Sequence, residues 1–140
     1  MLKMNEENPE KQAFYDLFQT TGWDLEFTVD SLYEAISNSW YVVSVYENKQ
    51  LVGYGRILSD GVYQAMICDL IVLPSLQGKG IGTKILERLL AKCKQQDIKM
   101  VVLMSARCKA GFYEKFGFKK RHPEAPGMIW NGELGRNAEI

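Results

Sequence analysis

The chain has 140 residues, of which 46% are hydrophobic and 24% are charged, and its formal net charge is zero. This length predicts one domain over residues 1–140, and no apolar run approaches the roughly 20 residues of a membrane span, so we expect no membrane partner. Three cysteines, odd in number and far apart, and a single histidine argue against a disulfide framework and against a metal site. Together with the lack of a secretory signal pattern in the first 20 residues, they favour a reducing cytoplasm.

The charges are sorted along the chain although they cancel. Residues 1–35 contain eight acidic and two basic residues, whereas residues 79–121 contain twelve basic and three acidic ones. Two interpretations stay open: solvated helix faces, or a site with a basic end for an anionic cofactor and an acidic end for a cationic substrate. The lysines lack the interleaved aromatic residues of a nucleic-acid surface, so we expect no nucleic-acid partner.

The hydrophobic period predicts two helices at the start of the chain, over about residues 8–20 and from an N-cap at Thr28 to about residue 39. Three strand-like runs follow, and turn-forming clusters at 47–50 and 59–61 separate them. These runs are WYVVSVYE (40–47), QLVGYGRIL (50–58) and VYQAMICDLIVL (62–73).

After Pro74 the period becomes helical over about 78–95, and a strand (99–105) and a short helix (109–116) come next. FKKRHP (118–123) and GMIWN (127–131) are expected to be closing strands. This order predicts an α+β fold, with a mixed, mostly antiparallel central sheet and helices on both faces.

Three glycines alternate in LQGKGIGT, residues 76–83, between the third predicted strand and the helix that follows it. Glycines at such a junction usually let backbone amides approach a phosphate. The stretch fits neither a Walker A loop, which needs another spacing before its lysine, nor a dinucleotide fingerprint, whose third glycine position is Thr83. What remains is Gln77-x-x-Gly80-x-Gly82 after Leu70-x-Val72-x-Pro74.

This pattern resembles the acetyl-CoA loop of the GNAT superfamily of N-acetyltransferases, in which Q/R-x-x-G-x-G/A follows a strand and the pyrophosphate lies over the helix N-terminus. Unpaired amides and the positive end of the helix dipole suit that role, and glycine lets the phosphates come close. A glycine-rich turn that only packs the helix onto the strand is the alternative. The resemblance implies that acetyl-CoA is bound by Gln77, Gly78, Lys79, Gly80, Ile81, Gly82 and Thr83.

GFYEKFGF, residues 111–118, matches a second motif of the same family, FYEK-x-GF, so the resemblance covers residues 63–118. It implies that Phe112 contacts the cofactor and that Tyr113 protonates the departing thiolate. A phenol with an ordinary pKa of about 10 can supply that proton. The alternative for these aromatic residues is core packing.

The family resemblance also implies that the strand before the loop contacts the acetyl and pantetheine groups through the backbone of Leu70, Ile71 and Val72. An amide there can stabilise the oxyanion while an amine attacks the thioester directly. The glutamates that serve as bases in some relatives correspond to Met66 and Val101 here. Asp69 is the nearest carboxylate, and it is either the base or a residue that faces solvent or caps a neighbour; proton loss through water is a further alternative.

The resemblance places the acceptor beside the first two helices and their connection, near Trp23, Asp24 and Glu26. The acidic N-terminal third favours a cationic primary amine on a small molecule or a peptide. The first strand of the family is short or absent here, which would leave a sheet edge for a second subunit, so we expect a homodimer. An acetyl-CoA sensor without turnover is the alternative to an enzyme, although Tyr113 would have no use there.

Overall fold

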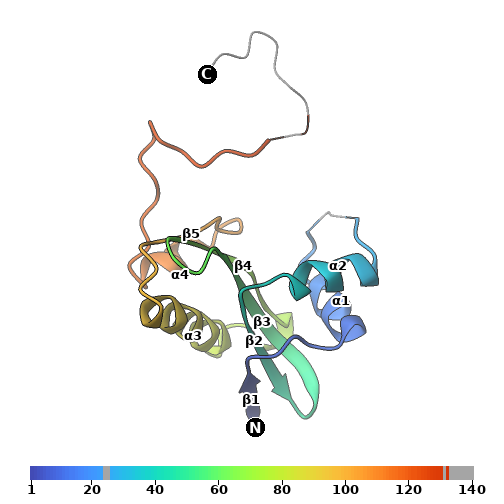
Figure 1. The fold of residues 1–140 in the computed structure, drawn as a ribbon. Coiled ribbons are helices and arrows are strands. Elements are labelled where there is room, and N and C mark those ends of the chain that lie inside the picture. The colour runs from blue at the N-terminus through green and yellow to red at the C-terminus, as the bar shows by residue number, and fades with distance from the viewer. Residues whose placement is uncertain (24–25, 131, 133–140) are drawn as a thin grey trace. The chain divides into compact units, whose positions relative to one another are not determined.

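The structure is a computed structural model that describes residues 1–23, 26–130 and 132 (Figure 1). Contacts within the chain divide it into two compact units, residues 1–103 and residues 104–140.

The first unit is built on a five-stranded sheet in the order β1-β2-β3-β4-β5. The strands β1 to β4 pair antiparallel in that order, and β5 pairs parallel to β4. The mixed, mostly antiparallel sheet is therefore confirmed. The strands are β1 (Leu2–Asn5), β2 (Tyr41–Glu47), β3 (Gln50–Ser59), β4 (Gln64–Val72) and β5 (Met100–Leu103).

The first strand is short but present, since β1 pairs with β2 over its whole length. This strand was not among the elements expected from the sequence, because LKMN is too short to show a hydrophobic period. β1 covers the edge of β2 that suggested a partner subunit. The homodimer stays a prediction without that support.

Both predicted hairpin turns are present. Asn48 and Lys49 have φ values of 50° and 69°, and Glu47 pairs with Gln50, as expected for a two-residue turn whose twist matches the strands. In the β3–β4 turn the carboxylate of Asp60 accepts hydrogen bonds from the amides of the next residues, Val62, Tyr63 and Gln64.

Two capped helices cover one face of the sheet, α1 (Lys11–Gln19) and α2 (Val29–Ser37). Glu10 accepts hydrogen bonds from the first amides of α1, and Thr28 and Ser31 form a capping box on α2, as the sequence predicted for Thr28. The apolar faces of the two helices pack with Tyr54 of β3 in one cluster, which includes Phe14, Leu17, Phe18, Leu32 and Ile36.

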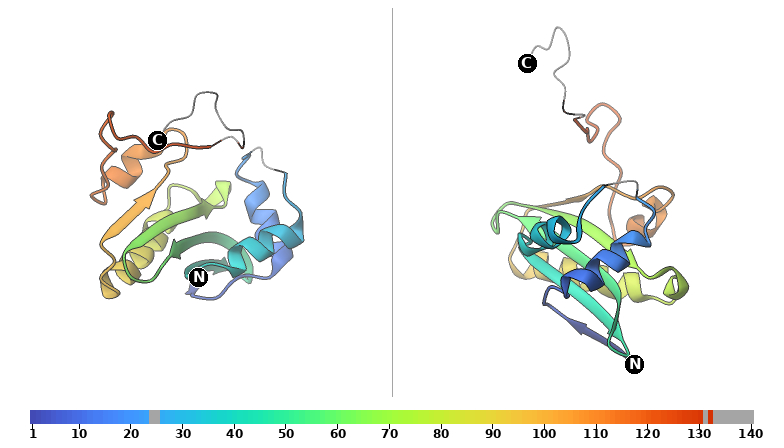
Figure 2. Two further views of the ribbon diagram at one scale, coloured as in Figure 1. Left: turned by 45° about the horizontal axis from the view of Figure 1, so that its top comes forward. Right: turned by 90° about the vertical axis from the view of Figure 1, so that its right-hand side faces the viewer.

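The helix α3 (Ile81–Gln95) covers the opposite face. Side chains alternate along a strand, so Gly53 and Gly55 face away from the Tyr54 side. A Cβ atom on Gly55 would lie 2.7 Å from Cγ2 of Ile85, which shows how closely α3 approaches β3. Figure 2 shows the sheet between α3 and the α1–α2 pair, so the expected helices on both faces are confirmed.

The second unit contains one short helix among its described residues, α4 (Ala110–Glu114). Residues 118–130 are all described and contain no strand, so the two expected closing strands are wrong; residue 131 lies outside the described part. Lys119, Lys120 and Arg121 are consecutive charges, and Met128 and Ile129 are consecutive apolar residues that are both more than 80% exposed. Neither run has the alternation of a half-buried strand.

Candidate functional site

The glycine loop joins β4 to α3 through a single turn of 3-10 helix, η1 (Pro74–Leu76). Gly78 and Gly80 have φ values of 79° and 86°, a left-handed conformation that residues with a Cβ atom adopt rarely. Because of these angles α3 begins at Ile81, three residues after the predicted start at about residue 78. A Cβ atom on either glycine would meet no atom within 4 Å, so packing does not explain the glycines.

The N-terminus of α3 differs from those of α1 and α2. Those two helices are capped by Glu10 and Thr28, whereas the N-cap of α3 is Gly80, which has no side chain to accept a hydrogen bond. The first amides of a helix have no carbonyl partner within it, and they carry the positive end of its dipole. The first turn of α3, with Gly82 and Thr83, therefore offers donors to an anion.

The remaining loop residues have distinct environments. The side-chain amide of Gln77 donates a hydrogen bond of 3.0 Å to the carbonyl of Val72, so this side chain fastens the loop to the end of β4. Lys79 is exposed and provides a positive charge near Gly80. Ile81 is 3% exposed and belongs to the core, so it offers the loop its backbone only.

A bulge interrupts β4 just before the loop. Tyr54 pairs with Ile71 but Arg56 pairs with Cys68, so Gly55 lies opposite two residues, Asp69 and Leu70. The extra residue of a bulge leaves the ladder locally disrupted and redirects a side chain. Asp69 has a φ of 53°, a left-handed backbone conformation that is uncommon for residues other than glycine. Of the three residues whose backbone was predicted to contact the cofactor, Leu70 lies in the bulge, whereas Ile71 and Val72 pair with Tyr54 and Gly53 of β3.

The carboxylate of Asp69 pairs with Arg56 of β3. Nε of Arg56 lies 2.6 Å from Oδ2 of Asp69, and the two side chains are 13% and 20% exposed. Arg56 also donates to the carbonyl of Ala35 at 3.2 Å and lies 3.4 Å from Oγ of Ser39. Asp69 therefore does not face solvent as an isolated charge: it is held by a cation that also holds the end of α2.

Sequence reasoning missed Arg56, although a signal was present. Arg56 is the one charged residue in QLVGYGRIL, and Asp69 is the one charged residue in ICDLIVLP. Charges of opposite sign inside two consecutive apolar strands of a predicted hairpin indicate an ion pair between them, because a lone buried charge is costly.

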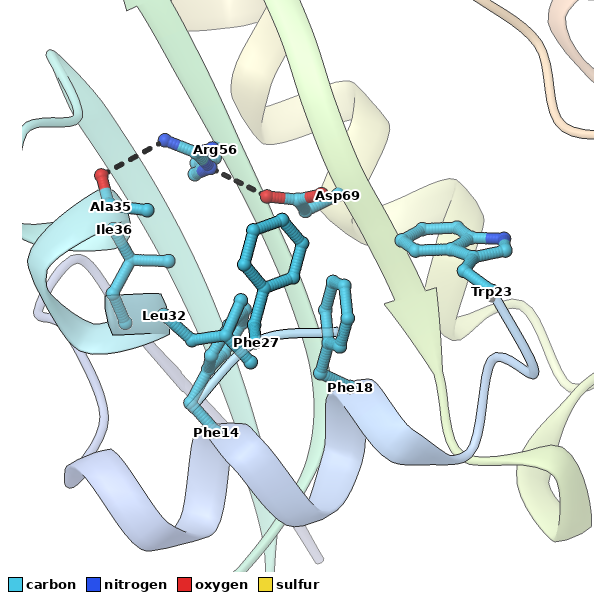
Figure 3. Close-up of a pocket in the computed structure, with 9 residues that line it drawn as sticks. All are labelled: Phe14, Phe18, Trp23, Phe27, Leu32, Ala35, Ile36, Arg56 and Asp69. Carbon is cyan, nitrogen blue, oxygen red and sulfur yellow. Dashed lines mark hydrogen bonds and ion pairs between the residues drawn. The ribbon is translucent and has the colours of Figure 1, made fainter. Parts of the chain in front are cut away.

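A pocket of about 200 Å³ opens beside this ion pair, between the α1–α2 side of the first unit and the strands β3 and β4 (Figure 3). The ion pair and Ala35 form one part of its lining. The rest of the lining is apolar and mainly aromatic, from Phe14, Phe18, Trp23, Phe27, Leu32 and Ile36.

The structure brings together Trp23, which was predicted to lie near the acceptor, and Asp69, the candidate base, since both line this pocket. Glu26 is exposed and does not belong to the described lining. Asp24 lies outside the described residues. Phe18 packs against two other aromatic residues of the lining: its ring centroid lies 5.5 Å from that of Trp23 and 6.2 Å from that of Phe27, both edge to face.

Tyr113 belongs to the second unit, on α4 beside Phe112. Its ring centroid lies 5.1 Å from that of Phe112 and 6.0 Å from that of Phe118, both edge to face. Burial raises the pKa of Tyr113 above its ordinary value, so the phenol holds its proton at neutral pH. The residue can act as a proton donor and also packs in an aromatic cluster.

Among the described residues no group of three or more histidine, cysteine, aspartate or glutamate side chains could hold a metal ion. None of the helices in this described part is long and apolar enough to cross a membrane.

Comparison with known proteins identifies the family. Residues 6–126 match the model of the acetyltransferase (GNAT) domain. An uncharacterized N-acetyltransferase of Pyropia yezoensis is 30% identical over 118 residues, covering 81% of this chain and 67% of that protein. A histone acetyltransferase of Glycine max is also 30% identical, over 81% of this chain, which spans only 54% of that protein.

The fold agrees with the sequence comparison. A GNAT family acetyltransferase from Streptococcus pneumoniae superposes with a TM-score of 0.81 at 28% identity, over 97% of this chain and 99% of that chain. The residues that match the family model, 6–126, include the glycine loop and the bulged strand. This chain belongs to the GNAT family of acetyltransferases.

Proposed function

We propose that the protein transfers the acetyl group of acetyl-CoA to a primary amine of a small molecule or a peptide. The observation that carries this proposal is the uncapped N-terminus of α3, which follows two left-handed glycines directly after a bulged strand. A family of acetyltransferases that matches residues 6–126 supports the enzymatic alternative over a sensor without turnover.

The residues that bind acetyl-CoA in this proposal come from three segments. The amides of residues 78–83 bind its pyrophosphate, with Lys79 adding a positive charge. The backbone of Leu70, Ile71 and Val72 at the bulge binds the acetyl and pantetheine portions, and Phe112 adds an apolar contact.

The co-substrate supplies a thioester carbonyl, which the amine attacks so that a C–N bond forms and the C–S bond breaks. Tyr113 gives its proton to the leaving thiolate and regains one from water. Ordinary pKa values of about 10 for a phenol and about 8.5 for a thiol make that transfer uphill by about 2 kcal/mol, and the raised pKa of Tyr113 adds to this. This cost is small compared with an enzymatic barrier, so the transfer is feasible.

Asp69 takes the proton that the nitrogen loses. An alkylammonium ion has an ordinary pKa of about 10.4 and no lone pair, so it has to lose one proton to the solvent before it can attack the thioester. Asp69 therefore orients the amine, and once the C–N bond forms it takes the second proton from the nitrogen, which the new bond makes acidic. Its 20% exposure lets the proton pass on to water.

The proposal is tested by thiol release from acetyl-CoA against a panel of polyamines, aminosugars, aralkylamines and peptides. Release with one class of amine, together with a matching acetylated product, is the expected result. Binding of acetyl-CoA with no release across the panel would contradict the proposed reaction.

The cellular setting is a separate proposal. All three cysteines, Cys68, Cys93 and Cys108, are free in the structure, which suits a reducing compartment such as the cytoplasm. Mass spectrometry of the protein isolated under alkylating conditions would show whether the thiols are reduced in the cell.

A further inference from the structure

From the lining of the pocket beside Asp69 we infer that the acceptor is a small aralkylamine, a primary amine on a short chain that ends in a single aromatic ring. The inference rests on the proposed function, since it assigns the acceptor of that reaction. It narrows the sequence-based expectation of a cationic primary amine on a small molecule or a peptide.

The apolar part of the pocket is suited to a ring. Phe14 and Ile36, both 1% exposed, form a buried floor, whereas Trp23 and Phe27 stand at the rim with 38% and 45% of their surface exposed. Large aromatic side chains left half exposed at the mouth of a concave site gain contact area when an aromatic guest enters. The edge-to-face contacts of both with Phe18 hold them in place.

The polar part of the pocket is suited to one amine. Of the described residues in the lining, two are charged, Arg56 and Asp69, and they neutralise each other. A polyamine would bring several positive charges to a single, already paired carboxylate. The hydroxyl groups of an aminosugar would lie against phenylalanine and leucine without partners, and unpaired polar groups are costly to bury.

The position of Asp69 links the pocket to the reaction. Asp69 directly precedes Leu70, where the bulge of β4 frees the backbone that contacts the acetyl group in the proposed function. An amine that donates to Asp69 therefore lies beside the expected thioester, and its ring lies in the aromatic part of the pocket (Figure 3).

The volume limits the size of the guest. A pocket of about 200 Å³ is smaller than the roughly 300–1,000 Å³ of sites for drug-sized ligands. One ring with a short chain fits this space, whereas a peptide side chain with its backbone has to extend outside it.

The first test compares kcat/KM for 2-phenylethylamine, n-butylamine, spermidine, glucosamine and a lysine peptide. We expect 2-phenylethylamine to exceed each of the others by at least about tenfold. Equal or better turnover of spermidine, glucosamine or the peptide would overturn the inference while supporting the proposed acetyl transfer.

Variants test whether this pocket is the binding site of 2-phenylethylamine. Phe27→Ala should raise KM for 2-phenylethylamine about tenfold and leave KM for acetyl-CoA unchanged. Tyr33→Ala is the matched control, because Tyr33 is an aromatic residue of similar exposure, 40%, on α2 outside the described lining. An unchanged KM in Phe27→Ala would overturn the assignment of this pocket.

A binding measurement separates this inference from the proposed function. Calorimetric titration with 2-phenylethylamine, with and without coenzyme A, needs no turnover. If no amine is acetylated but 2-phenylethylamine binds and Phe27→Ala abolishes its binding, acetyl transfer fails and the aralkylamine site stands. If 2-phenylethylamine does not bind under either condition, the site is refuted.

Discussion

Arg56 and Asp69 join three elements at one point: Nε of Arg56 lies 2.6 Å from Oδ2 of Asp69, while Nη1 of the same guanidinium donates to the carbonyl of Ala35 at the end of α2. The pair thus connects β3, the bulge of β4 and the helix that forms one wall of the pocket. A single side chain, Arg56, therefore contacts both Asp69 and the helix that forms that wall.

Arg56→Met should lower the free energy of unfolding by about 2 kcal/mol. Breaking a buried ion pair by removing one partner costs about 3–5 kcal/mol, and the partial exposure of this pair reduces that figure. Urea denaturation measures the change. Lys11→Met is the control, because it removes an ion pair with Asp30 whose side chains are 53% and 82% exposed, and it should leave the midpoint unchanged. Equal midpoints for Arg56→Met and wild type would show that the pair contributes nothing to stability.

Tyr113→Phe should lower kcat about 100-fold and leave KM for acetyl-CoA within about twofold, because general acid catalysis typically contributes 10²–10⁴-fold and the ring contacts are kept. Steady-state kinetics with the best amine measures both values. Tyr63→Phe, at a tyrosine that is 49% exposed in the β3–β4 turn, serves as the control. A large rise in KM for acetyl-CoA with kcat intact would instead identify Tyr113 as a packing residue.

Gly82→Asp should weaken acetyl-CoA binding more than tenfold without destabilising the protein. A carboxylate in the first turn of α3 interacts well with the helix dipole but repels a pyrophosphate bound there. Calorimetry gives the affinity and thermal unfolding gives the stability. Ala91→Asp puts the same charge at an exposed position further along α3 and should keep the affinity. Unimpaired binding by Gly82→Asp would mean that the phosphates lie elsewhere.

Gly55→Ala should destabilise the protein by about 2 kcal/mol, in the range of overpacked cores. The new Cβ atom would lie 2.7 Å from Cγ2 of Ile85 and 3.0 Å from Cδ1 of Leu89, so α3 has to shift. Chemical denaturation provides the value. Gly111→Ala is the control, because its Cβ atom would meet nothing within 4 Å. Wild-type stability for Gly55→Ala would show that α3 moves away from β3 at no cost.

Stability should fall in alkali, in part through Tyr54. Burial raises the pKa of Tyr54 above its ordinary value of about 10, so the folded state keeps a proton that the unfolded state loses. The stabilisation is complete below about pH 10 and is lost as the pH rises through the folded pKa. Denaturation curves between pH 7 and 11.5 should show a steeper decline for wild type than for Tyr54→Phe. Parallel declines would show that Tyr54 does not contribute.

The elements predicted correctly are those whose conformation depends on residues close together in the sequence. Thr28 caps α2 and Asn48-Lys49 turns β2 into β3 through hydrogen bonds and backbone angles within a few residues, and the sequence predicted both. The glycine loop was recognised for the same reason, since its conformation depends on Gly78 and Gly80 themselves. The prediction of two closing strands was wrong because it rested on the composition of these segments. Three consecutive charges and an apolar run do not alternate between polar and apolar residues as a half-buried strand does.

The sequence by itself therefore determined the helices, the hairpins, the glycine loop and the family, because each follows from side chains close together along the chain. Only the tertiary structure decided the pairing of Arg56 with Asp69, the bulge that turns Asp69 to a φ of 53°, and the aromatic pocket. Those features join residues 14 to 69, and they depend on a strand register that slips by one residue opposite Gly55. A period of two cannot reveal such a slip, since it becomes visible only when both strands are paired.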